Sequence, residues 1–493
     1  KKQMWRRLTG LLLTVGMFTN LATGAWAINQ PGAEVIDASQ KTSETVLSQA
    51  LQKDLTLTDA EALLALGDYL PDRLLVKVAP GAGIEEDLQT GEVLASQVLL
   101  ESSDSFAEPG TWLALEVEDY HGLANLMVEL GNQEDVLAVE PDYEISLPAE
   151  PQLAKSETEK QQTLQQTEAL SAGASIDQPY LNGYGIPAGW EFLQKNGMTP
   201  GQGVVIAVVD SGVAVNHPDL KNQILRDGSG NVWGKSFVES EPSVEDENGH
   251  GTHVAGIIAA ENNDFGTTGV AYGAKIMPVK VMSKDGVGSS SNIIAGLKYA
   301  AVQGADIINL SLGGGVFSQA ETDVLDLLAD LGVIVVSAAG NSGAPNEKLA
   351  NEAEYNQTLY APYYSVIGVM AEAVAPAENG DRLAAYSNWD VTANNAMEYN
   401  LMAPGTNIFS TYLRDGYQIM NGTSMAAPVV SGMAACITGY VNQAGIDGLK
   451  QFDKADRYAY VYGQLAGASS YQQGLTYQNK TYDYREANLY EML

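Results

Sequence analysis

Four short runs of apolar residues lie in the second half of this 493-residue chain, and each of them is nearly continuous. They cover residues 204–209, 275–282, 305–310 and 332–338. A strand with water on one face alternates apolar and polar side chains, whereas a strand buried on both faces is apolar throughout. The runs therefore predict an α/β fold, a mostly parallel sheet with helices on both faces. Asp210 and Asn341 follow two of the runs, at the edge where open α/β sheets bind ligands.

A smaller pattern precedes the large one and covers residues 72–147. It predicts strands at 73–80, 97–103, 111–119 and 136–147, with helices at 84–93 and 122–132. This β-α-β-β-α-β order is the ferredoxin-like pattern. We therefore expect a small α+β domain ahead of the large domain.

Composition limits the classes of partner. The formal net charge is −35, which argues against nucleic acid and anionic membranes as partners. The single cysteine, Cys436, excludes an intramolecular disulfide, and its apolar surroundings favour a small buried side chain over a reactive thiol. Residues 1–27 combine early Lys and Arg, an apolar stretch and Ala25-Trp26-Ala27, which is typical of a secretory signal. We therefore expect a secreted product with no membrane association after processing.

Three segments carry an acid, a base and a hydroxyl in small-residue surroundings: residues 208–212 with Asp210, 248–256 with His250 and His253, and 421–428 with Ser424. A serine hydroxyl needs an imidazole to take its proton, and the imidazole needs a carboxylate to orient it. Two other chemistries are disfavoured. A zinc protease site would need a His-Glu-x-x-His pattern, and an esterase or lipase would need Gly-x-Ser-x-Gly, and neither motif is present at these segments.

The order Asp, His, Ser and the residues that surround them in these segments resemble those of the subtilisin-like serine proteases, the subtilase family (peptidase S8). The resemblance implies that Asp210, His250 and Ser424 form the catalytic triad. It also implies an oxyanion hole made by the Ser424 N–H and by Asn341, which stands in Ala338-Ala339-Gly340-Asn341-Ser342.

Further residues are implied by the same resemblance. Two edge segments would hold an extended peptide between them, and they contain Ser311, Leu312, Gly313 and Gly286, Val287, Gly288. A structural calcium ion would be held by Asp219, Glu261, Asn263, Phe265 and Thr267, because these offer only oxygen ligands. Asp177 could add another ligand.

The resemblance also predicts the organisation of the chain. Residues 1–27 would be the signal peptide, 28–71 an extension of the pro-region, 72–147 an inhibitory prodomain, 148–176 a linker with the maturation site, and 177–493 the peptidase domain. We expect a secreted, monomeric serine endopeptidase that acts on protein or peptide substrates and is first inhibited by its own prodomain. The alternative is a noncatalytic binding or maturation protein that cleaves itself once and keeps its cleft occluded.

Overall fold

The computed structural model describes thirteen parts of the chain. They are residues 55–82, 93–101, 109–118, 122–151, 178–314, 318–344, 366–373, 382–390, 399, 401–444, 454–467, 470–477 and 480–493. The predicted signal peptide (1–27), residues 84–92 of the helix expected at 84–93, and most of the predicted linker lie outside these residues, as does Asp177.

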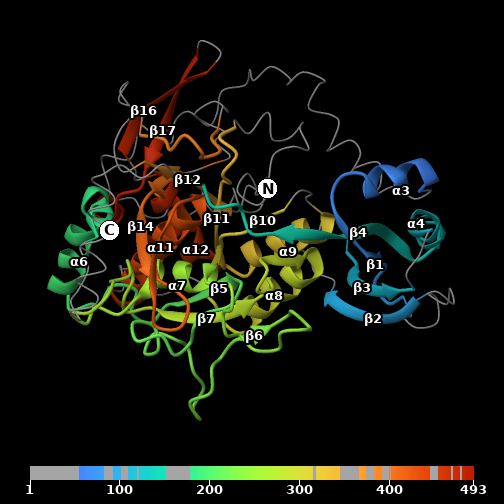
Figure 1. The fold of residues 1–493 in the computed structure, drawn as a ribbon, viewed down its shortest axis with the longest axis horizontal. Coiled ribbons are helices and arrows are strands. Elements are labelled where there is room, and N and C mark those ends of the chain that lie inside the picture. Colours follow the sequence, from blue (N-terminus) through green and yellow to red (C-terminus); the bar gives the residue numbers. More distant parts are fainter. Residues whose placement is uncertain are drawn as a thin grey trace.

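A twisted, mostly parallel sheet forms the centre of the larger unit (Figure 1). Its described strands follow the order β16 (Ser470–Tyr477), β17 (Lys480–Glu486), β13 (Leu401–Pro404), β12 (Val366–Glu372), β11 (Ile334–Ala338), β9 (Ile307–Leu310), β5 (Val205–Asp210), β7 (Lys275–Lys280) and β6 (Lys235–Ser236). Every described pair is parallel except β16–β17. The four apolar runs became β5, β7, β9 and β11, so the predicted fold class is confirmed.

Successive side chains of β5 enter different cores, because neighbours on a strand point to opposite faces. Ile206 and Val208 pack with helices α7 (His250–Ala259) and α11 (Thr423–Ala444). Ala207 and Val209 pack with helices α8 (Ser290–Val302) and α9 (Gln319–Asp330). The sheet is thus buried on both faces, which explains why its strands are continuously apolar. Helices α6 (Ile186–Lys195), α12 (Lys454–Gly467) and α13 (Leu489–Met492), with the 3-10 helix η2 (Pro179–Tyr184), complete this unit.

Helix α11 is the central helix of the core. Among the described helices it alone is long and apolar enough to span a membrane. However, 94% of its most apolar stretch is buried inside the fold. Cys436 lies on this helix and is fully buried, as its apolar surroundings predicted.

The smaller unit has the predicted ferredoxin-like sheet, with strand order β4-β1-β3-β2. Its elements are α3 (Leu57–Leu64), β1 (Tyr69–Val78), β2 (Val93–Leu100), β3 (Thr111–Val117), α4 (Leu123–Gly131) and β4 (Val136–Ser146). The boundary predicted at residue 72 is too late, because Leu55, Ala60 and Leu63 belong to the same core as Leu126 and Leu130. Val93, expected at the end of a helix, instead begins β2.

The two units are joined by strand pairing and by buried carboxylates. The end of β4 lies between β8 (Val287–Ser289) and β10 (Gly313–Gly314), and it pairs antiparallel with both. Glu140 accepts hydrogen bonds from the first N–H groups of α9, and Asp142 accepts two from Ser291 at the start of α8. Free N–H groups at a helix start favour such carboxylates.

Candidate active site

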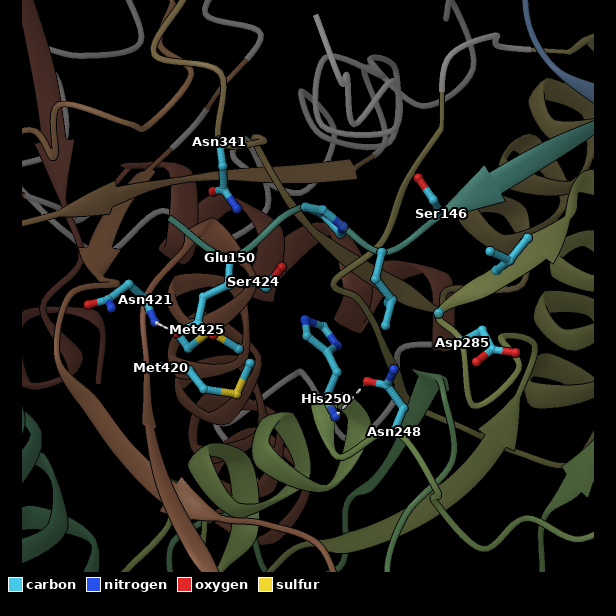
Figure 2. A pocket seen from close by; sticks show the side chains of 14 residues that line it. Ser146, Glu150, Asn248, His250, Asp285, Asn341, Met420, Asn421, Ser424 and Met425 are labelled. Atoms are coloured by element: carbon cyan, nitrogen blue, oxygen red, sulfur yellow. Dashed lines mark hydrogen bonds between the residues drawn. The ribbon is translucent and has the colours of Figure 1, made fainter. Parts of the chain in front are cut away.

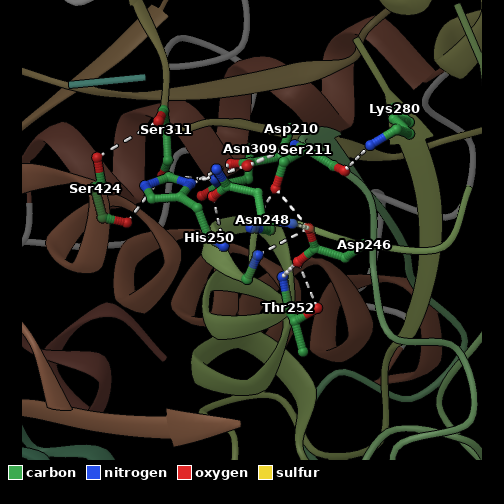
Figure 3. A network of polar contacts seen from close by, with 12 residues as sticks. Asp210, Ser211, Asp246, Asn248, His250, Thr252, Lys280, Asn309, Ser311 and Ser424 are labelled. Atoms are coloured by element: carbon green, nitrogen blue, oxygen red, sulfur yellow. Dashed lines mark hydrogen bonds and ion pairs between the residues drawn. The ribbon is translucent and has the colours of Figure 1, made fainter. Parts of the chain in front are cut away.

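Asp210 and His250 meet at the carboxyl edge of the sheet. Asp210 ends β5, and His250 begins α7. Both oxygens of the Asp210 carboxylate lie within 2.9–3.0 Å of His250 Nδ1 (Figure 3). The contact fixes the imidazole so that its other nitrogen, Nε2, is free of hydrogen bonds within the described residues and lies in the same cavity as Ser424.

The glycine after His250 makes this contact possible. A Cβ added to Gly251 would lie 2.1 Å from the Gly212 carbonyl oxygen and 3.1 Å from the Asp210 Cβ. A real side chain would therefore force α7 away from β5. The requirement for close approach explains the glycine in the His-Gly-Thr-His string.

Asp246 holds the loop ahead of α7 in place. Its carboxylate accepts hydrogen bonds from Ser211 Oγ, from the backbone N–H groups of Asn248, Gly249 and Thr252, and from Thr252 Oγ1. Ser211 Oγ in turn accepts from the Gly251 N–H at 3.0 Å. Asp246 thus caps α7 and ties it to the residue after Asp210.

A buried lysine supports the opposite side of Asp210. Lys280 lies beside Asp210 in the parallel register of β5 and β7. Its ammonium donates to the Ser211 carbonyl at 2.6 Å and forms an ion pair with Glu241 at 3.0 Å. The ion pair compensates the cost of burying the ammonium. We missed Asp246 and Lys280 in the sequence; an acidic residue four positions before the helix start was the available signal for Asp246.

Ser424 stands in the first turn of α11, where backbone N–H groups are free of helical partners. Proline at 428 has no N–H to donate to the Ser424 carbonyl four residues earlier. Ser311 Oγ takes this role and donates to the Ser424 carbonyl at 2.9 Å. The Ser424 hydroxyl lies 3.4 Å from the Ser311 carbonyl. Ser311 therefore supports the backbone of Ser424.

Asn341 is oriented by Thr423. Its Oδ1 accepts from the Thr423 N–H and from Thr423 Oγ1, both at 2.9 Å. This leaves the amide nitrogen, Nδ2, directed into the cavity that His250 and Ser424 also line (Figure 2). There Nδ2 donates to the carbonyl of Ala149 at 3.1 Å. His250, Ser424 and Asn341 thus line one cavity, and Asp210 joins them through its contact with His250 Nδ1.

The segment after β4 crosses this cavity in extended form (Figure 2). Ser146 pairs with Val287 on one side and with Gly313 on the other, and the Leu147 N–H donates to the Gly286 carbonyl at 2.8 Å. Gly286, Val287, Gly288 and Gly313 therefore lie against the extended end of β4. Leu312 does not: it is fully buried in the core beneath the cleft. Ser311 is also buried and contacts Ser424 instead.

The three described histidines have different electrostatic surroundings. Burial lowers the pKa of His250, but the carboxylates of Asp210, Asp246 and Glu150, Asp210 first among them, together raise it by more, so the net pKa is raised. Burial lowers the pKa of His253 to about 3, and its Nε2 donates to the Ile408 and Gln418 carbonyls. Burial also lowers the pKa of His217, which donates to the Gly416 carbonyl. His253 and His217 are neutral structural groups, and His250 alone of the three faces the cavity.

The residues proposed as metal ligands surround Asp219. Its carboxylate accepts from Asn263 Nδ2, the Thr267 N–H and the Tyr417 hydroxyl, and its backbone carbonyl accepts from the Glu261 N–H. The Asn263 Oδ1 accepts from the Phe265 N–H. Among the described residues, no group of three or more His, Cys, Asp or Glu side chains is placed to hold a metal. Gln178, which we did not predict, hydrogen-bonds both backbone groups of Thr268 beside this loop.

Comparison with known proteins agrees with this geometry. The subtilase family (peptidase S8) profile matches residues 201–452. Subtilisin DY of Bacillus licheniformis is 38% identical over 255 residues, which are 52% of this chain and 83% of the relative. Subtilisin BL of Lederbergia lenta is 39% identical over 49% of this chain and 78% of the relative. Thermitase of Thermoactinomyces vulgaris is 37% identical over 51% of this chain and 78% of the relative. The chain therefore belongs to the subtilase family of serine endopeptidases.

Proposed function

We propose that this serine endopeptidase is made as a precursor whose own N-terminal domain blocks the cleft until it is removed. The observation that carries the proposal is the extended tail of β4, which lies between β8 and β10 with the Ala149 carbonyl on the Asn341 amide. An extended peptide that adds to exposed strand edges is a recurring mode of substrate binding. The prodomain therefore occupies the place of a protein substrate.

The proposed roles follow from the contacts. Ser424 Oγ attacks the substrate carbonyl, and His250 Nε2 takes its proton and returns it to the departing amine. Asp210 keeps the proton on Nδ1 and stabilises the imidazolium. Asn341 Nδ2 and the Ser424 N–H stabilise the oxyanion. Water then hydrolyses the acyl-enzyme. The alternative, a noncatalytic protein that cleaves itself once, is not favoured by the family membership.

The pH profile of turnover tests this scheme. Only neutral His250 can accept the Ser424 proton, so activity is present above the His250 pKa and lost below it. Because that pKa is raised from 6.5, we expect kcat/KM on a fluorogenic peptide to fall by about tenfold per pH unit below a midpoint above pH 6.5. Initial rates of the mature enzyme across the acid range measure this. A flat profile, or a midpoint well below pH 6.5, would contradict the assignment of His250 as the base.

We further propose a calcium ion at Asp219. The carboxylate is buried, its pKa is raised by burial, and the groups that contact it are a neutral amide, a backbone N–H and a phenol. Thr267 Oγ1 beside it is buried and has no hydrogen-bond partner among the residues that the structure describes. Oxygen atoms of Asp219, Asn263 (after a half turn of its amide), Glu261, Phe265 and Thr267 would hold the ion. Their donor chemistry fits calcium better than a transition metal.

Thermal unfolding tests the calcium proposal without reference to activity. At 100 times its dissociation constant, a ligand that binds only the folded state stabilises it by about 2.7 kcal/mol. We expect calcium, and not magnesium, to raise the Tm by several degrees, and Asp219→Asn to abolish the rise. Asp264→Asn, in an exposed acid of the same loop, is the matched control and should keep it. If calcium raised the Tm equally in both variants, the ion would not be bound by Asp219, and the proposed site would be wrong.

The remaining parts of the proposal concern organisation. We propose that residues 1–27 direct secretion, that residues 28–147 form the pro-region, that cleavage falls in 148–176, and that residues 177–493 act as a monomeric peptidase on protein substrates. The strong negative charge supports the absence of nucleic acid and anionic membranes among its partners.

A further inference from the structure

We infer that the first self-cleavage of the precursor breaks the peptide bond between Ala149 and Glu150. The inference rests on the proposed function, and it identifies the first peptide bond that the precursor cleaves in its own chain. Three observations carry it: the register of the tail in the cleft, the hydrogen bond on the Ala149 carbonyl, and the contact of the Glu150 side chain.

The register of the tail is fixed over consecutive residues. Glu144, Ile145 and Ser146 pair with Ser289, Gly288 and Val287 in turn, and the Leu147 N–H donates to the Gly286 carbonyl. A slip by one residue would reverse the faces of the strand and expose Ile145, which is buried. The position of the tail relative to the catalytic groups is therefore determined before it reaches them.

The carbonyl that reaches the oxyanion donor belongs to Ala149. Asn341 Nδ2 donates to it at 3.1 Å, and Thr423 holds the Asn341 amide in that orientation. A donor in this position can stabilise the negative charge that develops on that oxygen as the tetrahedral intermediate forms. Figure 2 shows Asn341 and His250 on opposite sides of the tail, with Ser424 between them.

The residue after this carbonyl is held on the leaving-group side. Glu150 accepts a hydrogen bond from the Asn421 N–H at 3.1 Å, and it lines the cavity together with His250. Two contacts thus bracket the bond, one on each side: Asn341 on the carbonyl of residue 149 and Asn421 on the side chain of residue 150.

The step balances as an ordinary peptide hydrolysis. Ser424 Oγ forms a bond to the Ala149 carbonyl carbon, and its proton passes to His250 Nε2. The bond to the Glu150 nitrogen breaks as His250 returns the proton, which releases a chain that begins with the Glu150 amine. Water then attacks the Ala149 ester, gives one proton to His250 and leaves the Ala149 carboxylate, and Ser424 regains its hydroxyl.

The test is a time course of the full-length precursor with intact-mass measurement of both fragments at the earliest times. We expect a fragment that ends at Ala149 and its complement that begins at Glu150, and neither in Ser424→Ala. Glu150→Pro replaces the departing N–H by a ring carbon, so this cut should slow by about 10²-fold or more. Glu150→Ala removes the contact with Asn421 but keeps the departing N–H, so it should be cut at the same bond, more slowly than the wild type and much faster than Glu150→Pro.

The outcomes separate the two proposals. A first cut at another bond that also requires Ser424, or unchanged cutting at this bond in Glu150→Pro, would overturn the assignment and leave the proposed function intact. A folded wild-type precursor that neither cleaves itself nor yields peptide turnover would overturn the proposed function. If Glu150→Pro fails to fold, which circular dichroism would reveal, the wild-type and Glu150→Ala fragment masses still decide the bond.

Discussion

Ser424→Ala is expected to abolish peptide turnover and to leave the precursor uncut. The substitution removes the atom that forms the acyl bond while keeping the first turn of α11, in which the Ser424 carbonyl is supported by Ser311. Loss of the serine nucleophile of such a triad costs about 2 × 10⁶ in kcat. Activity on a fluorogenic peptide and the mass of the purified chain together measure the effect.

The control for this substitution is Ser229→Ala, which removes the hydroxyl of an exposed loop serine outside the three catalytic segments. This variant should mature and turn over peptide like the wild type. Turnover by Ser424→Ala within tenfold of the wild type would show that another group is the nucleophile.

Breaking the buried ion pair between the two units is expected to release the cleaved prodomain far sooner. Lys77 on β1 and Asp323 on α9 are both buried, and Lys77 Nζ lies 2.8 Å from Asp323 Oδ2. The same oxygen accepts from Trp112 Nε1 at 2.7 Å. Removing one partner of a buried pair typically costs about 3–5 kcal/mol, because the other charge stays buried. Lys77→Met or Asp323→Asn should therefore raise the dissociation rate by about 10²- to 4 × 10³-fold.

A double-mutant cycle distinguishes the ion pair from general damage to the interface. In Lys77→Met/Asp323→Asn no charge is left unpaired, and the asparagine can still accept from Trp112, so the double variant should dissociate more slowly than either single variant. Arg73→Met is the matched control, because Arg73 pairs with the exposed Glu239 at 3.5 Å and such pairs contribute about 1 kcal/mol or less. The lag before peptide turnover after self-cleavage reports release. Strictly additive effects would show that the two charges do not stabilise each other.

The sequence was sufficient for those features that depend on local pattern. Continuous apolar runs predicted β5, β7, β9 and β11, because a strand covered on both faces has no position left for polar side chains. The catalytic segments were recognisable because the chemistry and the close backbone approaches restrict several neighbouring residues at once, as the space around Gly251 illustrates.

Other features depended on contacts between residues distant in the chain. Helix α3 was missed because its short apolar stretch gains its stability from packing against α4. Leu312 was expected in the cleft but lies in the core. A residue next to a substrate-binding strand can point either into the cleft or into the core, and the local sequence does not decide between the two. Lys280 has no distinctive local pattern, and Asp246 has only its place four residues before a helix start. The roles of both emerged from their bonds to Ser211.

The amino-acid sequence by itself determined the fold class and the types of group at the site, because periodicity and small-residue segments are local properties. Only the tertiary structure decided which carbonyl of the tail meets the Asn341 amide and which charges are buried between the two units. Those features depend on the register of β4 between β8 and β10, and that register is set by long-range backbone pairing that leaves no signature in the linker sequence.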